Sequence, residues 1–168
     1  MPTNFERAFA GRPDVFAAWQ QLNGAIKANM DLRRYELATL AAARELRSSY
    51  CSLAHGSVLL EQFVDAEELR AIAADHRAAG LDETDVAVMD LAERVARDGT
   101  AVTDADRDRL RSLGLSDDEI LDVVLAAAAR CFFSTTLDAM AVEPDARYAE
   151  LPEELREVLV VGRPIAAA

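Results

Sequence analysis

The run "SSYCSLAHGSVLL" (residues 48–60) places a cysteine and a histidine four residues apart in a stretch that otherwise reads as a buried helix. Residues three and four apart are neighbours on a helix, so Ser48, Cys51 and His55 are expected to share one face. A thiol is a poor nucleophile until it is ionised, and a histidine one turn away can accept its proton or stabilise the thiolate. The same spacing fits a structural cysteine beside a packed histidine, because free cysteine is among the most buried residue types. Spacing alone leaves both interpretations open.

A carboxylate could complete this pair. Glu36 lies in "RRYELATLAAA", where the following residues are almost all small or apolar. It is either exposed on a narrow polar stripe or held inside with a partner, and inside we expect burial to raise its pKa. Glu36, His55 and Cys51 would then form a proton relay that ends at a thiol. The three residues match no familiar zinc pattern, so no metal or cofactor is expected.

The elements that must position these residues are helices. Almost every segment carries helix start and stop signals, and none shows a sustained strand pattern. We therefore predict an all-α bundle, formed as one domain over residues 1–168. Helices are expected near residues 13–29, 32–46, 50–63, 66–79, 83–97, 104–112 and 117–141, followed by a short helix and an apolar arm. The expected helix starts are Asp31, Asp65 and three capping-box pairs: Asp82 with Asp85, Thr103 with Asp106, and Ser116 with Glu119.

The charge and composition of the chain limit which kinds of partner the protein could bind and where it could be located. The net charge is -12, from 30 acidic and 18 basic residues, so phosphate backbones should be repelled and nucleic acid is an unexpected partner. No apolar run approaches the ~20 residues of a membrane span, and the first residues do not resemble an export signal. Two cysteines far apart in sequence do not form a disulfide framework. We expect a soluble cytoplasmic protein.

These residues resemble the motif of a known family. The order Glu36, eleven residues, Ser48, two residues, Cys51, three residues, His55 is similar to the E-x11-C-x-x-C-x-x-x-H motif. That motif marks the thiol-peroxidase branch of the alkylhydroperoxidase D and carboxymuconolactone decarboxylase family. "ELATLAAARELRSSYCSLAHGSVLL" resembles the family's helix, turn and active helix, and "DAMAVEPD" (138–145) resembles its downstream signature. The resemblance extends from about residue 16 to 145, and it implies an AhpD-like helical bundle that forms homo-oligomers.

One position departs from the motif, because Ser48 stands where the peroxidases have their first cysteine. In the family the two thiols close to a disulfide after peroxide is reduced, and a partner dithiol reopens it. A serine hydroxyl cannot take part in that exchange. The resemblance implies Cys51 as the peroxide-attacking thiol, His55 as its base, Glu36 as the relay carboxylate and Ser48 as the mark of the missing resolving thiol. Tyr50 is either a hydrogen-bond donor near this site or a packing aromatic.

The sequence is compatible with three functions. The first is a peroxidase-like enzyme that reduces a small-molecule hydroperoxide through a sulfenic acid on its single redox cysteine, with an external thiol reductant. The second follows the decarboxylase branch, where His55 and Glu36 act on a small carboxylated substrate. Such an anion would be repelled by the acidic chain unless Arg33, Arg34 or Arg44 faces the site. The third is a non-catalytic helical oligomer that binds a ligand or partner.

The sequence also allows expectations for residues outside the motif and for self-association. Cys131 reads as a core cysteine whose role as a resolving thiol stays open, and His76 reads as a solvated residue near a helix C-terminus. Trp19, Phe132 and Phe133 are expected in the core, where they could line an apolar pocket beside the thiol. Self-association, as a dimer, trimer or larger assembly, is expected from the resemblance and from the apolar tail "VLVVG", which needs cover.

Overall fold

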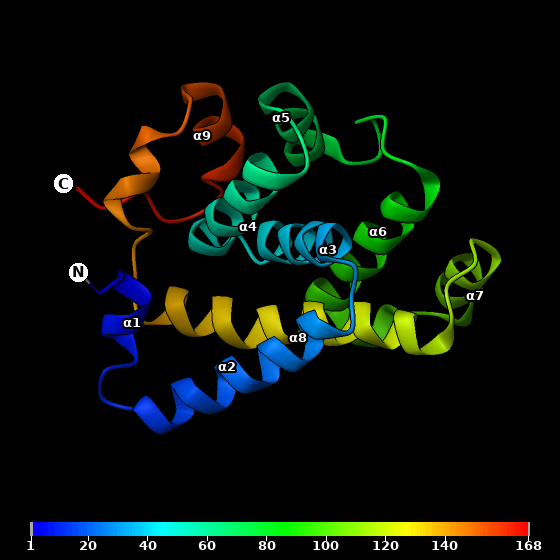
Figure 1. The fold of residues 1–168 in the computed structure, drawn as a ribbon, viewed down its shortest axis with the longest axis horizontal. Coiled ribbons are helices and arrows are strands. Elements are labelled where there is room, and N and C mark those ends of the chain that lie inside the picture. Colours follow the sequence, from blue (N-terminus) through cyan, green and yellow to red (C-terminus); the bar gives the residue numbers. More distant parts are fainter. Residues whose placement is uncertain (1, 168) are drawn as a thin grey trace.

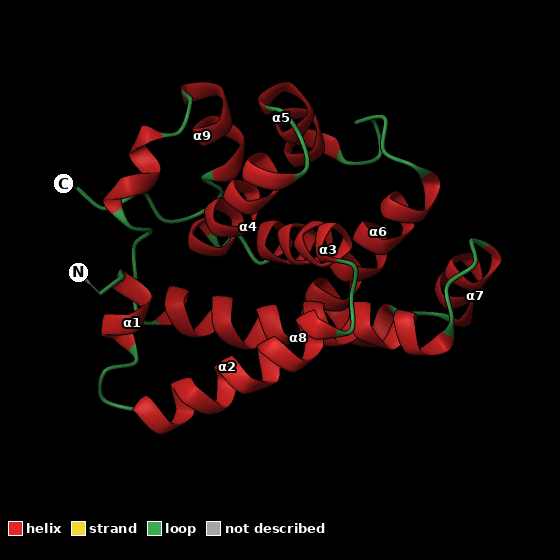
Figure 2. Ribbon diagram, in the orientation of Figure 1, coloured by secondary structure: helices red, strands yellow, loops and turns green. Residues whose placement is uncertain are grey.

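The computed structural model describes residues 2–167, and within that range it consists of helices and loops without a strand (Figure 2). The predicted all-α fold is therefore confirmed. In chain order the elements are α1 (Asn4–Ala8), α2 (Pro13–Ala28), α3 (Leu32–Glu45), α4 (Ser49–Gln62), α5 (Ala66–Asp75), α6 (Glu83–Asp98), η1 (Gly99–Ala101), α7 (Asp104–Ser112), α8 (Asp117–Ala139), η2 (Ala146–Glu150) and α9 (Glu153–Leu159). The elements η1 and η2 are short 3-10 helices.

Helix α3 lies at the centre of the molecule and packs against α4, α6 and α8 (Figure 1). Every residue from Tyr35 to Ala43 is buried. A helix that is apolar on all sides is buried on all sides, and the small residues of "LATLAAA" let its neighbours approach closely. Glu36 belongs to this buried run, so the helix that forms the core also carries a carboxylate into it.

Helix α8 is central on one face only. It packs against α2, α3 and α6, but Leu121, Leu125 and Phe132 are exposed along its outer side. Its length and composition would allow it to cross a membrane, yet half of its most apolar window is buried inside the protein. Core helices can have the same length and composition, so α8 is weak evidence for a membrane span. The prediction that Phe132 lies in the core is wrong, because this residue falls on the uncovered side of α8.

Local hydrogen bonds explain most helix starts. The Asp31 carboxylate accepts from the backbone N–H of Arg34, and Ser116 and Glu119 form the reciprocal bonds of a capping box at α8. The Thr103–Asp106 pair likewise starts α7.

The capping box predicted at Asp82 forms only in part. Asp82 accepts from the backbone N–H of Asp85, but the Asp85 carboxylate binds Arg33 and Arg34 of α3 and does not reach back to the cap. A tertiary ion pair has therefore replaced the second half of the local motif.

Helix α1 is not among the predicted elements, because five residues are too few for a periodic pattern. Thr3 and Glu6 cap it, and the backbone N–H of Asn4 donates to the Asp145 carboxylate at 2.7 Å. The Phe5 ring packs against aromatic rings of α2, α4 and α8. This short helix therefore closes one side of the region around α4.

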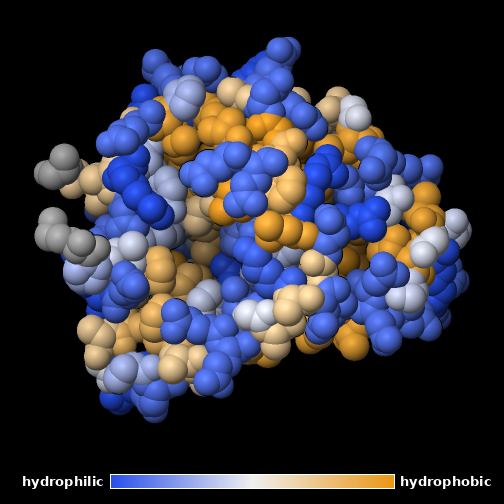
Figure 3. Space-filling model, in the orientation of Figure 1, coloured by the Kyte–Doolittle hydropathy of each residue, from blue (hydrophilic) through white to orange (hydrophobic). Residues whose placement is uncertain are grey.

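The C-terminal arm, residues 160–166, folds back over the start of α4. Leu159 is fully buried, and a Cβ on Gly56 would lie 2.9 Å from the Leu159 methyl groups. The Gly162 N–H donates to the Ser49 hydroxyl at 2.8 Å. The chain itself therefore buries Leu159 of the tail, while Val158, Val160 and Val161 stay half-buried. On the face shown in Figure 3, hydrophilic residues lie between smaller hydrophobic areas.

Candidate active site

Helices α3 and α4 bring Glu36 and His55 into contact, although nineteen residues separate them in the chain. The chain leaves α3 through Arg47, whose φ of 56° is in the left-handed region, and Ser48 then takes the N-cap position of α4. This turn lays α4 against α3. The Glu36 Oε2 atom lies 2.6 Å from Nδ1 of His55.

Both carboxylate oxygens of Glu36 have partners, and the side chain is only 1% exposed. Oε1 accepts from Nζ of Lys27 at 2.9 Å, while Oε2 accepts from His55. Burial acts to raise the pKa of Glu36, but the hydrogen bonds from His55 and Lys27 outweigh it, so the pKa is lowered. The expected rise of this pKa is therefore wrong, because a buried carboxylate with two donors is more stable ionised than protonated.

His55 is held as the neutral imidazole between an acceptor and a donor. Its Nε2 atom lies 3.2 Å from Nη1 of Arg130, and an arginine can only donate, so Nε2 accepts and the proton sits on Nδ1 facing Glu36. Burial lowers the pKa of His55 and outweighs the opposing hydrogen bond to Glu36; the Arg130 charge lowers it further. The ionised carboxylate, neutral imidazole and guanidinium thus form one consistent chain of hydrogen bonds.

Arg130 also lies at this site, although the sequence did not predict it there. It is 3% exposed on α8, and its Nη1 atom lies 3.9 Å from Sγ of Cys51. Nη2 donates to Asn23 Oδ1 at 3.0 Å. The signal was present in "LAAAARCFFS", where one charged residue interrupts an apolar helix. The reasoning applied to Glu36 applies equally to this arginine.

Arg130 also changes the connection between His55 and Cys51. Among the described residues no hydrogen bond joins His55 directly to Cys51, and the Arg130 guanidinium contacts both. Arg130 thus places a fixed positive charge beside the Cys51 sulfur, and His55 orients it. The connection between the imidazole and the thiol passes through the guanidinium and not through a direct hydrogen bond.

A pocket of about 220 Å³ leads to Cys51, which is itself 2% exposed. Trp19 stacks on Phe133 with ring centroids 4.0 Å apart, and the Arg130 guanidinium lies 5.2 Å from the Trp19 ring centre. The aromatic lining consists of Phe5, Trp19, Tyr35, Tyr50, Phe133 and Tyr148, and the charged lining of Lys27, Glu36, Arg130 and Arg147. The pocket thus combines aromatic walls with positive charge beside a thiol.

Ser48 and Tyr50 lie at the start of α4, the helix that carries Cys51. Ser48 is fully buried at the start of α4. The Tyr50 ring lines the pocket, but its hydroxyl donates to the Asp145 carboxylate, away from the thiol. Burial and the bond to Asp145 raise the pKa of Tyr50. Tyr50 therefore combines the two interpretations that the sequence left open, as a packing aromatic whose hydroxyl has a partner outside the site.

The other predicted candidates lie elsewhere. Cys131 is half-buried and does not line the pocket, and both cysteines are free thiols. Arg33 and Arg34 bind the Asp85 carboxylate, and Arg44 donates to the Val158 carbonyl. None of these three arginines lines the pocket. The positive charge that a carboxylated substrate would need is present, but other residues supply it.

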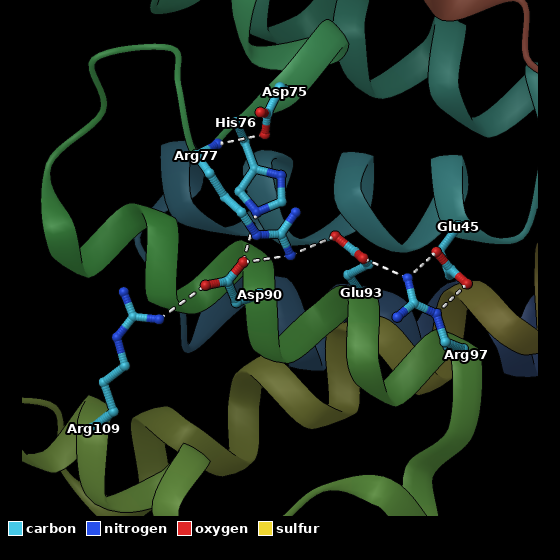
Figure 4. A network of polar contacts seen from close by, with 8 residues as sticks. All are labelled: Glu45, Asp75, His76, Arg77, Asp90, Glu93, Arg97 and Arg109. Carbon is cyan, nitrogen blue, oxygen red and sulfur yellow. Dashed lines mark hydrogen bonds and ion pairs between the residues drawn. The ribbon is translucent and has the colours of Figure 1, made fainter.

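His76 was predicted to be solvated and is in fact buried. It lies 2.9 Å from the Asp90 carboxylate, in an ion-pair network that connects α3, α6, α7 and the end of α5 (Figure 4). His76, Asp90 and Glu93 offer three potential metal ligands within 4.8 Å. The Arg77 guanidinium already bridges the two carboxylates at 2.7 and 3.0 Å. Arg77 therefore already supplies a cation to these carboxylates, and we interpret the network as structural.

Solved structures similar to this one share its fold at low sequence identity. An alkylhydroperoxidase AhpD core, an uncharacterized peroxidase-related protein from Ralstonia eutropha JMP134, superposes with a TM-score of 0.79 at 21% identity, over 96% of this chain and 83% of that one. An uncharacterized peroxidase-related protein from Silicibacter sp. TM1040 gives a TM-score of 0.82 at 22% identity, over 89% and 80%. A variant of the debrominase Bmp8 in complex with 2,3,4-tribromopyrrole gives 0.79 at 15% identity, over 94% and 83%. No protein of curated function matches the chain.

The chain has the all-helical AhpD-like fold, and one site brings together the buried Cys51, Glu36 and Arg130 with the half-buried His55. Residues 13–94 match the carboxymuconolactone decarboxylase family. The matched segment is just under half of the chain, and it contains Glu36, Cys51 and His55.

Proposed function

We propose that the protein reduces hydroperoxides through Cys51 and is returned to its thiol form by an external thiol. The observation that carries this proposal is the position of Arg130, with Nη1 3.9 Å from the Cys51 sulfur and 3.2 Å from Nε2 of His55. A thiol that faces a pocket beside a fixed guanidinium is in the electropositive setting that reactive cysteines require.

In the proposed reaction the Cys51 thiolate attacks one oxygen of the hydroperoxide. The O–O bond breaks, an S–O bond forms, and the leaving alkoxide takes up a proton equal to the one that the thiol lost. The thiol and the hydroperoxide thus become a sulfenic acid and an alcohol. Arg130 would stabilise negative charge on the sulfur and then on the leaving oxygen. Cys51 and Arg130 act as catalytic residues, while His55, Glu36 and Lys27 act as positioning residues.

Recycling requires a thiol from outside the motif, because Ser48 cannot form a disulfide with the oxidised Cys51. A thiol would condense with the sulfenic acid, releasing water and leaving a mixed disulfide. A second thiol would then attack that disulfide and release Cys51. We place this cycle in a reducing cytoplasm, in keeping with the two free thiols.

The test is mass spectrometry of Cys51 after titration with hydrogen peroxide or cumene hydroperoxide in the presence of dimedone, which traps sulfenic acids. A Cys131→Ser background limits the signal to one thiol, and Cys51→Ser is the control. We expect one dimedone adduct on Cys51. A thiol that stays reduced under excess peroxide would overturn the proposal.

A second candidate function is acid–base chemistry on a small carboxylated substrate, as in the decarboxylase branch. The observation that favours it is the positive lining from Lys27, Arg130 and Arg147, which removes the objection raised by the acidic chain. In this second function Cys51 takes no part in the reaction, so activity that survives Cys51→Ser would favour acid–base chemistry. If Cys51 is inert and no turnover is found, a binding role for the fold remains.

A further inference from the structure

The pocket that leads to Cys51 is positive in a strongly acidic protein. Three cationic side chains and one carboxylate line it, whereas the whole chain has a net charge of -12. Lys27 is 41% exposed and Arg147 is exposed, so an entering molecule meets these cations before it reaches the buried thiol. Charge of one sign along a cleft concentrates ligands of the opposite sign.

The size of the pocket limits what can reach the sulfur. Its volume of about 220 Å³ lies below the ~300–1,000 Å³ of pockets that hold drug-sized ligands. Thiol–disulfide exchange requires direct contact between the attacking sulfur and Sγ, because the new S–S bond is only ~2 Å long. Cys51 is 2% exposed, so an attacking sulfur must enter this small pocket to reach Sγ, which favours a small thiol over a protein surface.

A second approach, across the N-terminus of α4, is covered. The C-terminal arm lies on this turn, where the Gly162 N–H donates to the Ser49 hydroxyl and the Arg47 side chain donates to the Val161 carbonyl. A Cβ on Gly162 would lie 2.0 Å from the Arg47 carbonyl oxygen, so the contact is close. Ser48, which occupies the resolving position, is fully buried beneath it.

We propose that the thiol which regenerates Cys51 is a low-molecular-weight anionic thiol, and not a protein dithiol. This inference rests on the peroxidase function proposed above and names the partner of the same site. An anionic thiol RSH would convert the sulfenic acid to Cys51–S–S–R and water. A second RSH would then release the Cys51 thiol and RSSR, so that two thiols are oxidised for each hydroperoxide reduced.

The recycling half of the cycle can be tested without peroxide. In the Cys131→Ser protein, Cys51 is converted to its mixed disulfide with thionitrobenzoate, and release of the coloured thionitrobenzoate is followed. The thiols compared are 3-mercaptopropionate (anionic), 2-mercaptoethanol (neutral), cysteamine (cationic) and a reduced thioredoxin. Each rate is divided by the rate of the same thiol with the mixed disulfide of 2-mercaptoethanol and thionitrobenzoate. After this correction we expect the anionic thiol to exceed the cationic one by about tenfold at low salt, with the difference shrinking as salt is added.

A matched pair of variants separates the pocket from the overall charge. Arg147→Gln should lower the preference for the anionic thiol, whereas Arg70→Gln, which removes the same charge from an exposed position on α5, should not. Equal or faster reaction of cysteamine, fast reaction of thioredoxin, or equal effects of the two variants would each overturn the inference. Failure of Cys51 to form a sulfenic acid would overturn the peroxidase function and would leave the measured thiol preference intact, so the two failures are distinguishable.

Discussion

The guanidinium of Arg130 lies between the sulfur of Cys51 and the imidazole of His55, at 3.9 Å from Sγ and 3.2 Å from Nε2. It separates two residues that a helix places one turn apart, and it reaches them from α8. The charge that faces the thiol is therefore permanent, because an arginine does not lose its proton in a protein. His55 and Glu36 hold this charge in place.

Replacing Arg130 is expected to slow oxidation of Cys51. A hydrogen bond to a charged group contributes ~1.5–3 kcal/mol, so Arg130→Met should reduce the rate constant with hydrogen peroxide by about tenfold or more. Arg130→Lys keeps the charge but not the planar guanidinium, so its rate constant should lie between those of the native protein and Arg130→Met. Arg107→Met, at a half-buried position on α7 outside the pocket, is the matched control. Stopped-flow measurement of thiol loss gives the rates, and equal rates for the Met variants at positions 130 and 107 would remove Arg130 from the mechanism.

The Glu36–His55 contact should act through the position of Arg130. Glu36→Gln and His55→Gln are each expected to slow the reaction of Cys51 with peroxide and to change its pH profile. Because both act through one chain of contacts, the double variant should be no slower than the slower single variant. Asp90→Asn breaks the other histidine–carboxylate contact, outside the pocket, and should leave the rate unchanged. Additive losses, or an equal loss in Asp90→Asn, would contradict this coupling.

Stability should fall as the pH is lowered. The pKa of His55 is lowered from 6.5 and that of Glu36 from 4.5, so the unfolded chain binds these protons more readily than the folded one. The contribution of His55 to the free energy of unfolding is thus present above pH 6.5 and is lost as the pH falls below that value. The contribution of Glu36 is lost in the same way below pH 4.5. Each group contributes a slope of at most about 1.4 kcal/mol per pH unit. Urea unfolding between pH 7.5 and 5 should show a flatter dependence in His55→Gln, and an unchanged slope would refute the assignment of a neutral buried imidazole.

Ser48→Cys should restore the exchange that the native chain cannot perform. The new thiol would lie one turn before Cys51, at the start of the same helix. After one equivalent of peroxide we expect an internal disulfide, seen as the loss of two hydrogens in the intact mass and reversed by dithiothreitol. Ser48→Ala, which adds no sulfur, is the control. A mixed disulfide with added thiol in place of the internal bridge would show that the two sulfurs cannot meet.

Self-association remains a prediction, now attached to a different surface. Leu159 of the tail is buried by its own chain, whereas Leu121, Leu125 and Phe132 are exposed on α8. Light scattering at micromolar concentration should give a mass above the 18.3 kDa of one chain, and Leu125→Glu should lower it towards that value. A native mass of 18.3 kDa would contradict the prediction.

The sequence by itself determined the longer helices and the polar residues on α3 and α4. The buried run around Glu36 and the spacing of Cys51 and His55 are local patterns, and local patterns suffice because helix periodicity and capping depend on neighbours three or four residues apart. The range predicted for α7 matches the observed helix, Asp104–Ser112. The predicted helix at 66–79 is too long, because the chain turns after Asp75 to bury His76 against Asp90.

Only the tertiary structure decided which charges surround the thiol. Arg130 is 79 residues from Cys51 in the chain and 75 from His55, and the packing of α8 against α3 and α4 brings them together. Helix packing also gives Glu36 its two donors, His55 of α4 and Lys27 of α2. Together they lower the pKa of Glu36, whereas burial alone would raise it. Electrostatic effects act through space and not along the chain, so the ionisation of this site follows from helix packing and could not be read from residue spacing.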